Sequence, residues 1–61
     1  MNRPTVGQNE VEMRDLAVQI MRDNYRAADN AAKDGRLQQA AQHLEAAERW
    51  RVKARGHGAK V

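Results

Sequence analysis

The densest group of residues that could do chemistry lies near the C-terminal end of the chain, in the run Arg49-Trp50-Arg51-Val52-Lys53. Cations attract phosphate groups and a flat aromatic ring can stack on a nucleobase, so this combination is typical of a surface that binds nucleotides. A structural interpretation is equally open: Trp50 packs on the edge of a helix pair with its indole N–H at the rim.

Arg55 extends the basic run, and Tyr25 is the other aromatic residue of the chain. Tyr25 either contributes its ring to an oligomer core or stacks on a base. In the binding interpretation, an aromatic ring stacks on the base while cations hold the phosphates. The predicted ligand-binding residues are Tyr25, Trp50, Arg51, Lys53 and Arg55.

No catalytic, cofactor or metal site is predicted. The chain has no Cys, and its hydroxyl groups are those of Thr5 and Tyr25, so a nucleophile with an oriented base is not expected. His43 and His57 are fourteen residues apart and belong to no recognisable set of metal ligands. We therefore expect a protein that is not an enzyme.

The charge of the chain is uneven. Its 61 residues include 11 Lys and Arg and 8 Asp and Glu, a net charge of +3. Residues 1–48 carry a net charge of −2, whereas residues 49–61 carry five cations and no acid. Such an end attracts phosphate, nucleic acid or an acidic partner, or simply complements a helix dipole. No run is apolar enough to span a membrane, and residues 1–8 lack the apolar segment of a signal peptide, which predicts a cytoplasmic protein.

These residues must be positioned by helices. Residues 1–8 are predicted to be a flexible arm, since Pro4 and Gly7 disfavour regular structure. Asn9 is a suitable N-cap and Glu12 completes a capping box, so the first helix is expected over about residues 10–34.

A very short turn follows, with Gly35 suited to the left-handed position after a helix. The second helix is predicted over about residues 37–55, and Gly56-His57-Gly58 ends it. Residues 56–61 are predicted to be a flexible tail. The fold class is thus all-α, an antiparallel two-helix hairpin over residues 9–55.

The first helix has an apolar arc wider than one partner helix can cover, interrupted mainly by Arg14. A chain of this size buries only about 60% of its unfolded surface, and it lacks disulfides and metal ligands as staples. We therefore predict a homo-oligomer. The arc contains Val11, Met13, Leu16, Ala17, Val18, Ile20, Met21, Tyr25, Ala27, Ala28, Ala31 and Ala32.

The second helix has a narrower apolar stripe with His43 and Trp50 on its flank, and Arg51 falls inside it. Either this helix has left the core at Arg51, or Arg51 faces a polar site, with Glu48 as its local partner. Ion pairs typical of exposed helix faces are expected between residues four apart. The stripe contains Leu37, Ala40, Leu44, Ala47 and Ala54; the expected pairs are Asp29 with Lys33 and Glu45 with Arg49.

The turn and second helix resemble the second half of a tetratricopeptide repeat, with Gly35, Leu37, Ala40, Leu44 and Ala47 at the matching positions. Only one such unit is present, whereas about three are needed for a stable array. This resemblance implies a fold, a tight helical hairpin, and no particular activity.

A second resemblance rests on Leu44-Glu45, Ala47, Trp50 and Val52-Lys53, which form the pattern L-E-x-A-x-x-W-x-V-K. It is similar to the C-terminal helix of small phage anti-CBASS proteins, which act as cyclic-oligonucleotide sponges. That family implies a short, helical, oligomeric protein without catalytic activity that sequesters host signalling nucleotides in the host cytoplasm. Its base-stacking aromatic near the start of the chain has no counterpart before Tyr25.

The sequence therefore favours a non-enzymatic protein that holds a cyclic di- or trinucleotide between protomers. A helical adaptor or inhibitor that binds a host protein is the alternative. A hairpin dimer that binds RNA or DNA is a third possibility, weakened by a net charge of only +3.

Overall fold

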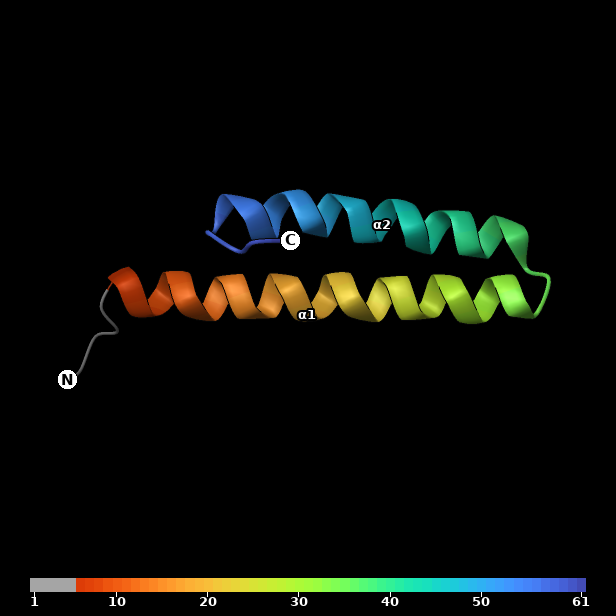
Figure 1. The fold of residues 1–61 in the computed structure, drawn as a ribbon, viewed down its shortest axis with the longest axis horizontal. Coiled ribbons are helices and arrows are strands. Elements are labelled where there is room, and N and C mark those ends of the chain that lie inside the picture. The colour runs from red at the N-terminus through yellow and green to blue at the C-terminus, as the bar shows by residue number, and fades with distance from the viewer. Residues whose placement is uncertain (1–5) are drawn as a thin grey trace.

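The computed structural model describes residues 6–61, which form two helices and no strand. Helix α1 spans Val6–Lys33 and helix α2 spans Leu37–Gly56, and the two lie antiparallel side by side (Figure 1). This confirms the all-α helical hairpin expected from the sequence. Association of copies stays a prediction, and residues 1–5 of the expected arm lie outside the described residues.

The start of α1 differs from the sequence prediction. The helix begins at Val6, so Asn9 lies inside it and is not its N-cap. Gly7 also lies inside the helix. A glycine within a helix costs only about 1 kcal/mol relative to alanine, too little to stop a long helix whose next turns are favourable. The start of the helix predicted from the capping-box residues Asn9 and Glu12 was therefore wrong.

Both helices end in the same hydrogen-bonded turn. At the end of α1, the Arg36 N–H donates to the Ala31 carbonyl at 2.8 Å and the Gly35 N–H to the Ala32 carbonyl at 3.0 Å. These two bonds define a Schellman motif, and Gly35 takes the left-handed conformation it needs, with φ of 76°. The role predicted for Gly35 is thus confirmed.

After α2 the same two bonds recur. The Ala59 N–H donates to the Ala54 carbonyl and the Gly58 N–H to the Arg55 carbonyl, each at 2.9 Å. Here Gly58, with φ of 96°, is the left-handed residue, and His57 is the C-cap. Of the glycines predicted to stop α2, Gly56 is still helical and Gly58 makes the turn.

The core between the helices consists mainly of alanine. Among residues 10–61 the buried side chains are Ala17, Met21, Ala28 and Ala31 on α1, and Ala47 and Ala54 on α2. Small side chains let the two helix axes approach closely, but each buries little apolar area. The hairpin therefore has close contact without a large hydrophobic core.

Two polar contacts fix the register of the helices. His43 Nδ1 lies 3.5 Å from Asn24 Oδ1, and His57 Nδ1 lies 3.1 Å from Glu10 Oε2. In both pairs the residue numbers add up to 67, so the helices stay aligned over four turns without slipping. Any residue of α2 can therefore be placed level with a residue of α1.

Candidate functional site

Trp50 and Arg51 lie on either side of the buried line of α2 that runs through Ala47 and Ala54. Both are between the buried residues Ala47 and Ala54, and successive helical residues are turned by about 100°. His43, Trp50 and His57 are spaced seven apart, so they share one side, which we call the histidine flank. The other side is the arginine flank, defined by Arg14, Arg51 and Arg55.

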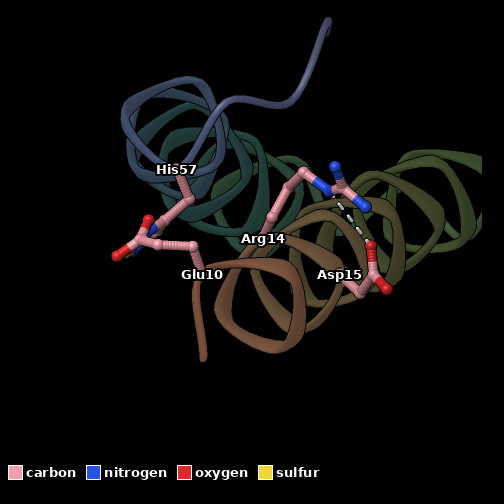
Figure 2. A network of polar contacts seen from close by, with 4 residues as sticks. All are labelled: Glu10, Arg14, Asp15 and His57. Atoms are coloured by element: carbon pink, nitrogen blue, oxygen red, sulfur yellow. Dashed lines mark hydrogen bonds and ion pairs between the residues drawn. The ribbon is translucent and has the colours of Figure 1, made fainter. Parts of the chain in front are cut away.

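Figure 2 shows the two flanks at the open end of the hairpin. His57 and Glu10 lie on one side of the contact between the helices, and Arg14 and Asp15 lie on the other. Arg51 and Arg55 are four residues apart on α2, which places them one above the other on a helix surface. The predicted ligand-binding residues of α2 are therefore divided between two flanks.

On the histidine flank, Trp50 and Lys53 interact with each other. Lys53 Nζ lies 4.4 Å from the centroid of the Trp50 ring, within the range of a cation–π contact. Trp50 is half-buried. A nucleobase that stacks on this ring face has to replace the Lys53 ammonium group. The half-buried position fits a packed Trp at the hairpin edge as well as a stacking platform, so both interpretations remain open.

On the arginine flank, Arg51 is exposed although it falls inside the predicted apolar stripe. Ala54, further along α2, is completely buried, so the helix has not left the core at this point. Within residues 10–61 no ion pair joins Arg51 to Glu48. The side chain of Arg51 thus keeps its charge in water at the edge of the helix contact.

The stripe itself is narrower than predicted. Leu37 and Leu44 leave 71% and 44% of their surface exposed, because they lie toward the edge of the contact and not on its centre line. The centre line passes through Ala47 and Ala54. Alanine rather than leucine occupies the closest approach, since larger side chains would force the helices apart.

Arg55 contacts the end of the chain: its Nε donates to the Val61 backbone oxygen. The segment after α2 therefore turns back toward that helix (Figure 1). The predicted surface pairs are confirmed, with Lys33 Nζ 3.1 Å from Asp29 Oδ2 and Arg49 Nη2 2.8 Å from Glu45 Oε1.

Tyr25 is half-buried on α1 and far from the basic end. The register places residue 16 level with Arg51, nine residues from Tyr25. At about 1.5 Å per residue, this separates the two by about 13 Å along the helices. A single chain does not bring Tyr25 together with Arg51 and Arg55, so a site that uses all of them needs a second chain.

Arg14 was not among the predicted ligand-binding residues, yet it belongs to the arginine flank. Its Nε lies 3.3 Å from Asp15 Oδ1, and the Arg14 side chain is 39% exposed. The sequence signal that could have identified it is the one that drew attention to Arg51: a cation within an apolar helix face.

An open depression on α1 is lined by Asp15, Val18, Gln19 and Arg22. Within the part of the chain that the structure describes, no three His, Cys, Asp or Glu side chains are placed to hold a metal ion. Neither described helix is long and apolar enough to cross a membrane.

Comparisons with known protein families, curated proteins and solved structures find no match to this chain. The two resemblances seen in the sequence thus stay expectations that rest mainly on the residues of α2.

Proposed function

We propose that this chain is a non-enzymatic binding protein of the cytoplasm that self-associates and sequesters a cyclic oligonucleotide between protomers. The observation that carries the proposal is the distribution of apolar side chains between the core and the surface of the hairpin. Its core is mostly alanine, whereas large apolar side chains on both helices stay exposed. The exposed residues are Val11, Met13, Leu16, Leu37, Leu44 and Val52.

Exposed apolar side chains favour a second copy as the partner. Leu16 and Val52 leave 51% and 69% of their surface in water, which is costly for side chains of this kind on a small hairpin. Because few apolar side chains are buried within the chain, association is the remaining source of hydrophobic stabilisation. Contact between copies also allows Tyr25 of one copy to lie beside the basic end of another.

The charges support an anionic ligand. Arg51, Lys53 and Arg55 are exposed at the open end of the hairpin, where the C-terminal residues carry no acid. A cyclic oligonucleotide fits a site between protomers because its phosphates need cations and its bases need flat apolar surfaces. A cyclic dinucleotide of two identical nucleotides has a twofold axis, which suits a site formed by the two copies of a symmetric dimer.

The proposal is tested by isothermal titration calorimetry with cyclic di- and trinucleotides, using Arg51→Ala and the control Arg36→Ala. Arg36 is exposed like Arg51 but lies at the opposite end of the hairpin. Each substitution removes one positive charge, so the two variants differ only in where the charge is lost. We expect Arg51→Ala to weaken binding about tenfold or more, the value of a hydrogen bond to a charged group, and Arg36→Ala to have little effect. Equal affinities of the two variants would contradict a site at the basic end.

A helical adaptor that binds a host protein is the second candidate. Leu37 favours it, because this side chain lies 71% exposed next to the turn, far from the basic end. Recovery of one stoichiometric protein partner by a chain that binds no cyclic nucleotide would support the adaptor over the sponge.

A further inference from the structure

A cation interrupts the apolar face of each helix. Arg14 lies within the apolar arc of α1, and Arg51 lies within the apolar stripe of α2. A charged group beside an apolar contact loses part of its hydration, which is unfavourable unless another charge or hydrogen bond replaces it. One ligand that pairs with both Arg14 and Arg51 would account for both cations at these positions.

The fold places both of these cations, Arg14 and Arg51, on the arginine flank. The register places Arg14 within about one helical turn of the level of Arg51 and Arg55 on the facing helix. Three arginine residues from two helices thus lie along one stretch of the arginine flank.

Within residues 10–61, the ends of these three side chains form no polar contact. Arg14 contacts Asp15 through Nε, and Arg55 uses Nε for the Val61 backbone oxygen. Among residues 10–61, no hydrogen bond or ion pair is formed by the Nη groups of Arg14 and Arg55, or by any part of the Arg51 guanidinium. The acids next to these arginines in the two helix sequences are Asp15 and Glu48, and Val61 supplies a further oxygen against Arg55.

We propose that Arg14, Arg51 and Arg55 form a phosphate-binding subsite on the arginine flank. A guanidinium fork pairs with two phosphate oxygens at once, and an anion removes the repulsion among three cations. This inference rests on the proposed function, since it assigns the ligand phosphates to the arginine flank. It adds Arg14 to the site, and it leaves Lys53 on the other flank, against Trp50.

The test is a titration with inorganic pyrophosphate at low ionic strength, followed through the Nε–H NMR signals of arginine. The Nε–H signals of Arg14, Arg51 and Arg55 are expected to shift together and to saturate with one dissociation constant. R14Q and R51Q are each expected to weaken binding about tenfold, as for a hydrogen bond between charged groups, whereas the control R26Q changes it less than about twofold. Arg26 is exposed on α1, so R26Q removes the same charge from the same helix as R14Q.

Equal weakening by R14Q and R26Q, or shifts that never saturate, would overturn the subsite. R14K keeps the charge and loses the fork, so it is expected to bind more weakly than the unchanged chain and more tightly than R14Q. Circular dichroism of each variant shows whether the helices are retained.

Cyclic di-GMP and a cyclic trinucleotide are then added to the pyrophosphate complex. Displacement of pyrophosphate supports both the subsite and the proposed function. Saturable pyrophosphate binding that neither nucleotide displaces supports the subsite and contradicts the proposed function. Nucleotide binding that R14Q leaves unchanged overturns the subsite and leaves the proposed function in place.

Discussion

Three glycines near the helix ends allow one chemical change to be compared in two backbone conformations. Gly35 and Gly58 are left-handed, with φ of 76° and 96°, whereas Gly56 is the last helical residue of α2. A Cβ atom added at any of the three meets no atom within 4 Å. Replacement by alanine therefore tests the backbone conformation alone, without a steric clash.

The magnitudes follow from the conformations. In Gly35→Ala the left-handed backbone costs roughly 1–2 kcal/mol, partly offset by about 0.4–1 kcal/mol from the stiffer unfolded chain. The free energy of unfolding should fall by about 1 kcal/mol. Gly56→Ala should instead raise it by up to about 1 kcal/mol, since alanine favours the helix. Gly58→Ala should have a smaller effect than Gly35→Ala, because fraying of the last turn relieves its strain.

The assay is thermal unfolding followed by far-UV circular dichroism. All variants are compared at one protomer concentration, because the stability of an oligomer depends on concentration. A change of 1 kcal/mol moves the midpoint of a domain this small by about 4–8 °C. We expect Gly35→Ala to melt below the unchanged chain and Gly56→Ala at or above it. Equal midpoints for these two variants would refute the left-handed turn at Gly35.

Ala47→Leu should lower the free energy of unfolding by about 1–3 kcal/mol in urea, because a larger side chain overpacks the closest approach of the helices; unchanged stability would contradict the alanine contact. Lys53→Gln should make Trp50 fluorescence more easily quenched by acrylamide, since the ring face loses its cation; equal quenching would mean the two do not interact in solution. Glu10→Gln should speed amide hydrogen exchange in the turn at His57 and leave the middle of α2 unchanged; uniform acceleration would show that the contact supports the whole hairpin.

Much of the fold could be predicted because its determinants are local. Helical periodicity and the absence of internal breakers indicate both helices, and Gly35 marks the turn through its backbone freedom. The start of α1 was predicted four residues late, since Asn9 favours a cap, whereas its cost inside a helix is only up to about 0.7 kcal/mol and did not end the helix there. The end of α2 was also ambiguous, because either Gly56 or Gly58 could take the left-handed position after the helix, and in the structure it is Gly58.

The candidate site was harder to predict than the fold. The run around Trp50 is visible in the sequence, but α2 divides it between two flanks. Arg14 is distant from Arg51 in the sequence, and only the pairing of the helices, marked by the contacts of His43 and His57, places the two on the same flank. Leu37 and Leu44 show the same difficulty, because periodicity places them in the stripe without indicating that alanine occupies its centre.

Native mass spectrometry of the chain, alone and with a panel of cyclic di- and trinucleotides, tests the central claim most directly. It counts subunits and bound ligands in one spectrum. We predict a homo-oligomer that retains one kind of cyclic nucleotide in a fixed ratio to its subunits. A chain that stays monomeric and retains none of them would contradict the proposed function.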